Sequence, residues 1–347
     1  MNDTIFNLSS YDYSLPKELI AQEPLFPRSQ HRLLIVNRRS GQISEGIFTE
    51  VKQFFQKGDC LVLNDTKVIN ARLFGKNDNQ AKIELLLIKE KEPGIWEALV
   101  KPGKRAKPGA VVFFDHGVSA KILERTGEGT IVVKFSRPEI KPFLDEAGLS
   151  PLPNYIKKQV TDHDHYQTVY AKNEGAIAAP TAGFHFTPEL LDELSAGGVK
   201  IVYFTLHCGL ATFRPIKAAD VREHKLPAEW MEFSKDCAQI VNQAKTEGKR
   251  VFAVGTTSIR ALESAACPDE TGRFLVKPYC GLTNIYINGD YKFKIVDAAI
   301  TNFHTPCSTN LVLISTFCGR DLLKKSYSYA IENKFRFFSF GDAMIVI

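Results

Sequence analysis

Four polar segments in the second half of the chain contain the residues best suited to chemistry. They are APTAGFHFTPELL from Ala179, TLHCGLATFRP from Thr205, VGTTSIRALES from Val254 and TNFHTPCST from Thr301. Each places hydroxyls, a histidine or an arginine beside small residues. Buried hydroxyls and imidazoles need hydrogen-bond partners, whereas Gly and Ala let a ligand approach the backbone. The four segments therefore predict one composite pocket for a polar ligand.

The segment after Val254 gives the strongest local signal. Gly255 allows a tight turn after a strand, and Thr256, Thr257 and Ser258 offer hydroxyls and backbone N–H groups at a helix N-terminus. Carboxylates, phosphates and ribose hydroxyls bind well in such a place. A plain helix cap made of Thr and Ser explains the same residues equally well. The segment contains neither GxGxxG nor a P-loop, so it does not indicate a dinucleotide or a nucleoside triphosphate.

Three histidines, His185, His207 and His304, fall just before a helix, at a strand end and on a turn. A single histidine of this kind is usually structural, but three near element ends favour a chemical role for at least one. The sequence has no HExxH and no GxSxG. Its one metal-like run, Asp162 to His165, lacks partners at a defined spacing, so we interpret it as a solvated loop and expect no metal site.

The composition of the chain limits its class of protein, its partners and its location. The chain has 347 residues, 44% hydrophobic and 24% charged, which is enough for a large core divided between two domains. A net charge of +5 permits a polyanionic partner without requiring one. Seven cysteines without a CxxC pair indicate reduced thiols. No apolar run approaches the roughly 20 residues of a membrane helix, and the first residues do not resemble a signal peptide, so we expect a cytoplasmic protein with no membrane contact.

The stretch from about Cys60 to Arg137 consists of short β-rich runs separated by Gly, Pro, Asn and Lys turns. This spacing predicts a small all-β barrel or sandwich. Its loop KPGKRAKPG, Lys101 to Gly109, carries four cations. A solvated hairpin turn is favoured over a phosphate-contacting finger, because basic clusters are common on surfaces.

From Tyr166 onward the pattern alternates between helix and strand. Thr187 is a suitable cap for a helix beginning at Pro188, and Gly197 and Gly198 end that helix before the strand VKIVYFTLH. A second helix stops at Gly248 and is followed by a strand ending at Val254. This alternation predicts an α/β layer.

A set of motifs spread over nearly the whole chain resembles one family. In order they are LPKELIAQEPLFPR, HRLL, LNDTKVINARLFG, YQTVYA, GAIAAPTAGFHFTPELL, TLHCGLATFRPI, GKRVFAVGTTSIRALES, TNFHTPCST and FRFFSFGDAM. The chain is similar in these motifs to the S-adenosylmethionine:tRNA ribosyltransferase-isomerase family of queuosine biosynthesis. The resemblance implies an α/β main domain, residues 1–59 and 153–347, interrupted by an inserted all-β barrel domain, residues 60–152.

The resemblance also implies an activity. Members transfer the ribosyl unit of S-adenosylmethionine to 7-aminomethyl-7-deazaguanine at the wobble position of tRNA, giving epoxyqueuosine, adenine and methionine. S-adenosylmethionine is then a substrate, and no permanently bound cofactor or metal is expected. The implied partner is tRNA carrying that base, and we expect a monomer. A tRNA-binding protein without catalysis, or another S-adenosylmethionine-dependent RNA-modifying transferase, remains as an alternative.

The chemistry suggests roles for particular residues. A sulfonium acidifies the neighbouring ribose C5′ proton, which a neutral histidine can remove. We expect His185 as the first candidate base, followed by His207 and His304, with Asp342 holding a ligand group or orienting a ring. Arg260 is suited to a bidentate grip on the methionine carboxylate. The predicted pocket residues are Thr181, Gly183, Gly209, Gly255, Thr256, Thr257, Ser258, Arg260, Asn302, Ser308 and Thr309.

The chain departs from the family pattern at several positions. Ala211 replaces a glycine in the usual HxGxGTF, Pro227 replaces a usual histidine, and Cys307 alters the turn after His304. These departures leave the expected class of reaction unchanged. They weaken the transfer of individual site roles.

Overall fold

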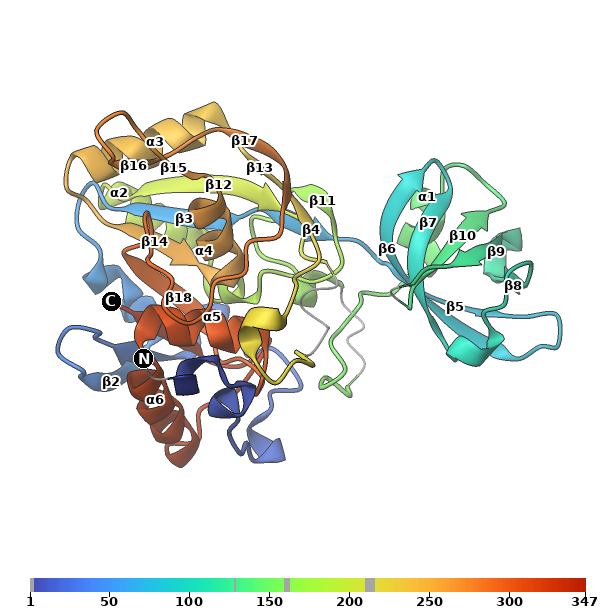
Figure 1. The fold of residues 1–347 in the computed structure, drawn as a ribbon, viewed down its shortest axis with the longest axis horizontal. Helices are drawn as coiled ribbons and strands as arrows, with labels where there is room; N and C mark the ends of the chain where they lie inside the picture. Colours follow the sequence, from blue (N-terminus) through green and yellow to red (C-terminus); the bar gives the residue numbers. More distant parts are fainter. Residues whose placement is uncertain (1–2, 128, 159–162, 210–215) are drawn as a thin grey trace. The chain divides into compact units, whose positions relative to one another are not determined.

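The computed structural model describes residues 3–127, 129–158, 163–209 and 216–347. The chain forms two compact units, whose elements are labelled in Figure 1. The first unit comprises Met1–Thr66, Asn154–Asn173 and Ala179–Ile347. The second comprises Lys67–Pro153 and Glu174–Ala178. The second unit is therefore inserted between strands of the first.

The first unit is built on a nine-stranded sheet in the order β17-β13-β12-β3-β14-β18-β19-β1-β2. Its four central strands, β12, β3, β14 and β18, run parallel to one another. Every residue of β3, CLVLN, and of β14, VFAV, is buried, as expected for strands covered on both faces. The bounds are β1 (Arg32–Val36), β2 (Ile43–Ile47), β3 (Cys60–Asn64), β12 (Lys200–Leu206), β13 (Glu229–Phe233), β14 (Val251–Val254), β17 (Tyr279–Thr283), β18 (Ala298–Asn302) and β19 (Ala343–Val346).

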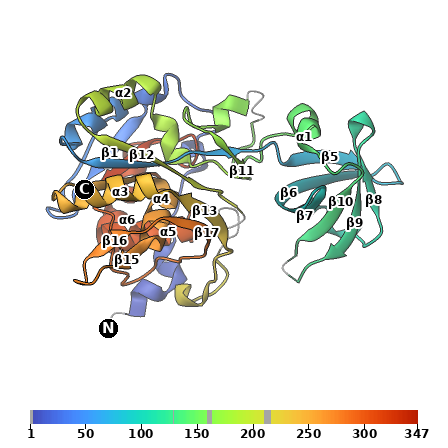
Figure 2. The ribbon, with the colours of Figure 1, turned by 90° about the horizontal axis from the view of Figure 1, so that it is seen from above.

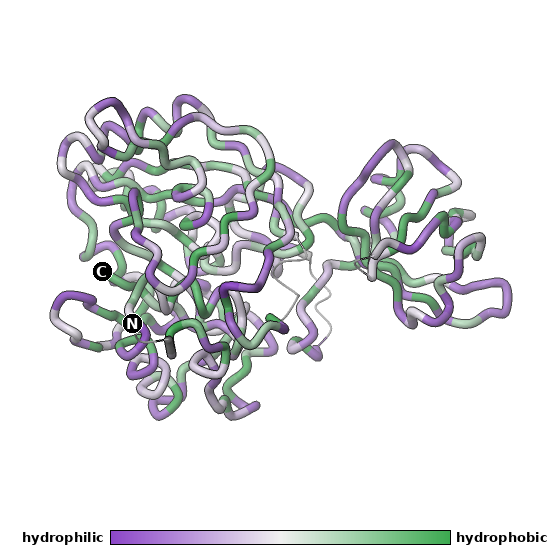
Figure 3. Tube along the Cα trace, viewed as in Figure 1, coloured by the Kyte–Doolittle hydropathy of each residue, from purple (hydrophilic) through white to green (hydrophobic). Residues whose placement is uncertain are grey.

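Helices cover both faces of this sheet, with α2 (Pro188–Ala196) on one side and α3 (Lys235–Thr246) and α4 (Gly255–Ser264) on the other (Figure 2). The remaining helices of the unit are α5 (Thr309–Cys318) and α6 (Arg320–Glu332). The Thr187 hydroxyl caps α2 by accepting from the Leu190 amide at 3.3 Å, and α2 ends before Gly198, whose φ is +85°. The predicted start and end of this helix are confirmed. Hydrophobic stretches follow the central strands, whereas peripheral turns are hydrophilic (Figure 3).

The second unit is a closed antiparallel barrel in the order β10-β7-β6-β5-β8-β9. Its strands are β5 (Arg72–Lys76), β6 (Lys82–Glu92), β7 (Ile95–Lys101), β8 (Val111–Phe113), β9 (Ser119–Arg125) and β10 (Ile131–Phe135). Closure leaves no open edge, and alternate residues such as Ile83, Leu85 and Leu87 fill the interior. The expected fold class, an α/β main domain with an inserted β-barrel, is confirmed.

Two details differ from the sequence-based expectation. The sequence pattern predicts that the run CLVLN, which begins at Cys60, belongs to the barrel, but as β3 it lies at the centre of the main sheet, between β12 and β14. The insertion consequently begins at Lys67 rather than residue 60. The barrel unit also contains a seven-residue helix, α1 (Lys141–Ala147), so it is not purely β.

Short strands complete the structure. β4 (Thr66–Val68) pairs with β11 (Asn173–Ala176) where the chain leaves and re-enters the first unit, and β15 (Ala266–Pro268) pairs with β16 (Phe274–Val276). Among the residues with described structure, no helix is both long enough and apolar enough to cross a membrane.

The buried carboxylate of Glu263, 2% exposed, holds the segment before β18 against α4. It accepts hydrogen bonds from the amides of Lys294, Ile295 and Val296 at 3.0–3.1 Å and from the Tyr291 hydroxyl at 3.0 Å. Glu263→Ala leaves several buried hydrogen-bond donors without an acceptor, so we expect the free energy of unfolding to fall by about 3 kcal/mol. Urea denaturation measures this loss, and the exposed Glu270→Ala serves as the control. A loss no larger than in the control would contradict the structural role of this carboxylate.

Candidate active site

Strand direction brings the polar segments to one edge of the main sheet. Because β12, β3, β14 and β18 are parallel, the residues after their carboxyl ends meet at the same edge, where open α/β sheets bind ligands. β19 runs antiparallel to β18 and parallel to β1. The residues preceding β1 and β19, His31 and Asp342, therefore lie at this edge as well.

A hydrogen-bonded chain of four side chains crosses the edge near β18. The Thr181 hydroxyl donates to Asn302 Oδ1 at 2.9 Å, and Asn302 Nδ2 lies 3.1 Å from His185 Nε2. His185 Nδ1 lies 2.7 Å from His31 Nδ1. If the Asn302 amide donates, His185 accepts at Nε2 and donates from Nδ1, so His31 carries its proton on Nε2. That nitrogen is buried and has no hydrogen-bond partner in the described part of the chain.

Burial keeps both of these histidines neutral. His185 is fully buried, and desolvation, with a contribution from His31, lowers its pKa well below the ordinary value. Desolvation and, after it, the nearby Arg336 lower the pKa of His31 to about 4. Both ring nitrogens of His185 are already engaged, so this side chain is placed to orient His31 rather than to meet a ligand directly.

His207 has a different environment, at the carboxyl end of β12. Its Nδ1 lies 2.8 Å from the Thr66 hydroxyl, and its ring stacks on Trp230 with centroids 5.0 Å apart. Desolvation lowers its pKa, while Asp65 acts in the opposite direction. Among the described residues its Nε2 has no hydrogen-bond partner, and the residue is only half-buried. His207 therefore combines a fixed ring with an available nitrogen.

His304 and Asp342 are tied into the fold. His304 Nε2 lies 2.8 Å from the Thr301 hydroxyl, its amide donates to the Tyr327 hydroxyl at 2.9 Å, and burial lowers its pKa to about 3. The Asp342 carboxylate accepts from the backbone amides of Arg32 at 3.0 Å and Arg336 at 2.7 Å. Desolvation raises the pKa of Asp342 despite these bonds. No bond from Asp342 to a histidine ring is present in the described chain, so its role in orienting an imidazole stays a prediction.

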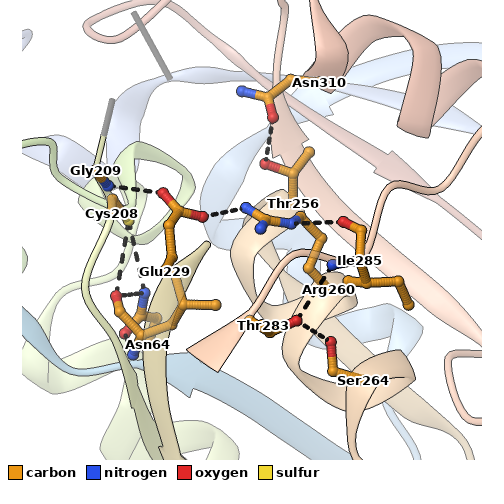
Figure 4. A network of polar contacts seen from close by, with 11 residues as sticks. Asn64, Cys208, Gly209, Glu229, Thr256, Arg260, Ser264, Thr283, Ile285 and Asn310 are labelled. Carbon is orange, nitrogen blue, oxygen red and sulfur yellow. Dashed lines mark hydrogen bonds and ion pairs between the residues drawn. The ribbon is translucent and has the colours of Figure 1, made fainter. Parts of the chain in front are cut away.

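Glu229, on β13, forms a buried ion pair with Arg260 of α4, as Figure 4 shows. The other carboxylate oxygen of Glu229 accepts from the Gly209 amide at 2.7 Å, and Arg260 Nε donates to the Ile285 carbonyl at 3.3 Å. Glu229 thus links the segment after β12 to α4. It also neutralises Arg260, which is therefore not a free cation awaiting a bidentate carboxylate.

Two buried polar atoms on α4, Thr257 Oγ1 and Arg260 Nη2, have no hydrogen-bond partner among the residues whose structure is described. Residues three apart share one face of a helix, so both belong to the same side of the first turns of α4. The neighbouring hydroxyls are occupied, since Thr256 donates to Asn310 Oδ1 at 3.1 Å and Ser258 to the Val254 carbonyl at 2.6 Å. Buried unpaired polar atoms are costly and therefore mark where a ligand would complete the structure.

The remaining predicted residues shape the edge. Ser308 caps α5 by accepting from the Leu311 amide at 3.2 Å, and the buried Thr309 begins that helix. Gly255 has a φ of +83°, which favours glycine. A Cβ on Gly183 would lie 2.0 Å from the Tyr170 hydroxyl, so the close packing there requires glycine.

Sequence reasoning missed two residues, His31 and Glu229. His31 directly precedes a strand within HRLL, and Glu229 ends EHKLPAE, but neither is marked by a neighbouring hydroxyl or glycine cluster. Ala211, one of the departures from the family pattern, lies outside the described residues. Cys307 takes a φ of +53°, uncommon for a residue other than glycine, and its amide donates to the Tyr11 carbonyl at 3.0 Å. Nothing in the structure explains Pro227.

The parallel strands, the inserted barrel and the polar edge define an α/β protein with a candidate ligand site at the carboxyl ends of its strands. The model of the family described as Queuosine biosynthesis protein matches residues 8–346, and the chain belongs to this family. It is 49% identical to the S-adenosylmethionine:tRNA ribosyltransferase-isomerase of Caldanaerobacter subterraneus over 98% of this chain and 99% of the relative. It is 46% identical to the protein of that name from Acetivibrio thermocellus, with the same coverage.

A solved structure supports the assignment. The crystal structure of S-adenosylmethionine tRNA ribosyltransferase from Thermotoga maritima matches with a TM-score of 0.56 and 36% sequence identity, covering 97% of this chain and 100% of that one. The likeness therefore extends over both units of the chain.

The buried neutral histidines predict how stability depends on pH. The pKa of His31 is about 4 in the folded protein, below the unfolded value of about 6.5. Between these values the unfolded state binds a proton that the folded state does not, so the free energy of unfolding falls as pH drops through this range. Removing the titration in His31→Gln reduces this slope by up to about 1.4 kcal/mol per pH unit.

Urea denaturation at several pH values between about 4 and 7 measures the slope. His116→Gln, which replaces an exposed barrel histidine, is the matched control. An unchanged slope in His31→Gln would mean that His31 is not held neutral by burial.

Proposed function

We propose that this chain is an S-adenosylmethionine:tRNA ribosyltransferase-isomerase. It transfers and isomerises the ribosyl moiety of S-adenosylmethionine onto 7-aminomethyl-7-deazaguanine at the tRNA wobble position, giving epoxyqueuosine in tRNA and releasing adenine and methionine. The observation that carries this proposal is the 46–49% identity to proteins of that name along nearly the whole chain. The polar edge of the main sheet supplies the kinds of groups that the reaction needs.

His207 is the best placed of the three predicted bases. Proton removal is most efficient when the pKa of the base lies near the operating pH, which disfavours His304, with a pKa of about 3, and the fully buried His185. The Thr66 hydroxyl also lies 3.5 Å from the Asn173 carbonyl, to which it can donate. It then accepts from His207 Nδ1–H, leaving the lone pair on Nε2. That nitrogen can remove the ribose C5′ proton of the sulfonium substrate.

The unpaired donors of α4 suit the polar part of S-adenosylmethionine. The Thr257 hydroxyl and one N–H group of Arg260 can each donate to a ligand oxygen of a carboxylate or ribose. This replaces the bidentate grip with a single bond from Arg260, because Glu229 occupies the other side of the guanidinium. The N-terminus of α4 adds a favourable field for a negative group.

The remaining features of the proposal follow from the substrate. S-adenosylmethionine is consumed, so the chain needs no permanently bound cofactor, and its second substrate is tRNA carrying the deazaguanine base. We further propose that it acts as a monomer in the cytoplasm, where tRNA is modified. Size-exclusion chromatography with light scattering tests the oligomeric state.

Mass spectrometry of both products tests the activity. Purified protein is incubated with S-adenosylmethionine and tRNA bearing 7-aminomethyl-7-deazaguanine. Epoxyqueuosine in the tRNA together with free adenine and methionine supports the proposal. S-adenosylhomocysteine instead would indicate a methyltransferase, and tRNA binding without any product would indicate a binding protein.

We expect His207→Asn to lower kcat by at least about 100-fold, because the variant lacks the nitrogen that acts as base. Asparagine can keep the contact of Nδ1 with Thr66, so the fold and the KM for either substrate should change little. Steady-state kinetics and a thermal melt measure both effects. His304→Asn is the comparison, and a larger loss of kcat in that variant would assign the base to His304.

Thr257→Val keeps the shape of the side chain and removes one hydrogen bond to the ligand. A bond worth about 0.5–1.5 kcal/mol predicts a KM for S-adenosylmethionine that rises by about twofold to thirteenfold. Thr316→Val is the control, since its hydroxyl donates to the Val312 carbonyl within α5 at 2.9 Å. Equal KM values in Thr257→Val and the wild type would remove Thr257 from the proposed pocket.

A further inference from the structure

The basic loop of the barrel, Lys101 to Gly109, is held in place by hydrogen bonds from a neighbouring strand. Arg125 of β9 donates through Nε to the Ala106 carbonyl at 2.6 Å and also bonds to the Gly103 carbonyl. Ala106 is fully buried, so the loop is anchored at its centre. Its flanking residues Lys104 and Lys107 are exposed. The cations are therefore presented on a fixed scaffold.

Exposed cations on the neighbouring strands enlarge the basic surface that this loop forms. Lys82 of β6 pairs with Lys76 of β5, which pairs with Phe113 of β8, and all three side chains are exposed. Arg105 donates to the Lys82 carbonyl at 3.0 Å, which joins the loop to this row. We define the basic face as six exposed residues on the outside of the barrel, Lys76, Lys82, Lys104, Arg105, Lys107 and Lys121.

Acidic side chains in the described part of the chain do not pair with these cations. In the part of the chain whose structure is described, none of the six forms an ion pair, whereas Glu84, which faces outward on the same strands, pairs with Arg72 at 3.6 Å. Asp78 lies in the turn between β5 and β6 and makes no ion pair with them. Like charges on one face repel, so this arrangement does not stabilise the fold and favours a polyanionic ligand.

Two exposed aromatic side chains accompany the charges. Phe74 of β5 is 55% exposed and Phe113 of β8 is 47% exposed. Phe74 precedes Lys76 by two residues and therefore faces outward on the same side of the strand. Cations next to exposed rings suit a nucleic acid, whose phosphates and bases they contact respectively.

We propose that the basic face of the barrel binds the phosphodiester backbone of the tRNA substrate. The inference rests on the proposed function for the identity of the RNA. The face holds the RNA by phosphate contacts that are independent of base sequence, while the edge of the main sheet acts on the modified base. An acidic protein would also be attracted by the cations, but the proposed activity already requires a polyanionic RNA partner.

The test compares two triple variants of the full chain. Lys82→Ala/Lys104→Ala/Lys107→Ala removes three cations of the basic face, and Lys89→Ala/Lys91→Ala/Lys324→Ala removes three exposed lysines elsewhere. Binding to unmodified tRNA is measured by fluorescence anisotropy at several salt concentrations. The KM for tRNA and for S-adenosylmethionine is measured in parallel, and thermal melting verifies that both variants are folded.

The expected result is a Kd for tRNA about tenfold weaker or more in the basic-face variant, with the slope of log Kd against log salt reduced by about 2 to 3. The KM for S-adenosylmethionine should be unchanged, and the control should stay within about twofold of the wild type. Equal binding by the basic-face variant and the wild type, or an equal loss in the control, would overturn the proposal.

The outcome is separable from that of the proposed function. Face-dependent tRNA binding without formation of epoxyqueuosine would support the surface and contradict the activity. Turnover that is insensitive to the basic-face substitutions would support the activity and overturn the surface.

Discussion

The parallel pairing of β12, β3, β14 and β18 is the constraint on which the site depends. Segments separated by up to about 240 residues in sequence meet only because these strands point the same way. Asn64, at the end of β3, fixes this alignment, since its side chain donates to the Leu206 carbonyl and accepts from the Leu206 amide, both at 2.9 Å. The carboxyl ends of β3 and β12 are thereby held together directly before His207, which follows β12.

The edge of the main sheet contains polar groups that are hydrogen-bonded within the protein and polar groups that are not. This difference distinguishes residues that position their neighbours from residues suited to contact a ligand. Asp342, Glu229 and His185 have their hydrogen-bonding atoms engaged by the protein. Such fully paired buried groups fix the positions of their neighbours. Thr257 and Arg260 each keep one buried atom that has no partner within the described ranges of the chain. The proposed function therefore gives ligand binding to these unpaired atoms and positioning to the paired ones.

Local sequence signals predicted much of this architecture. The Thr187 cap and the glycines after α2 fix a helix through bonds between near neighbours. The hydroxyl-rich segments after Val254 and Thr301 lie at the carboxyl edge of the sheet, and their role in a ligand site stays a prediction. The sheet containing CLVLN could not be predicted, because a five-residue buried run fits either a barrel or a central strand. Pairing with β12 and β14, far away in sequence, decides that question.

The site was predicted less completely for the same reason. His185 has the sequence context expected of a catalytic histidine, but its contacts with His31 and Asn302 occupy both nitrogens, and those contacts join residues 154 and 117 positions apart. The sequence suggests that Arg260 is a free cation that could bind an anion, but Glu229, 31 positions away, pairs with it in the structure. Long-range pairing of polar groups therefore decides which candidate is available for chemistry.

A crystal structure of the protein with bound S-adenosylmethionine tests the central claim most directly. The account predicts that the ligand lies at the carboxyl edge of the four parallel strands, with its ribose within about 3 Å of His207 Nε2 and an oxygen bonded to Thr257 or Arg260. A ligand bound at any other part of the molecule, or at this edge with its ribose against His304, would contradict it.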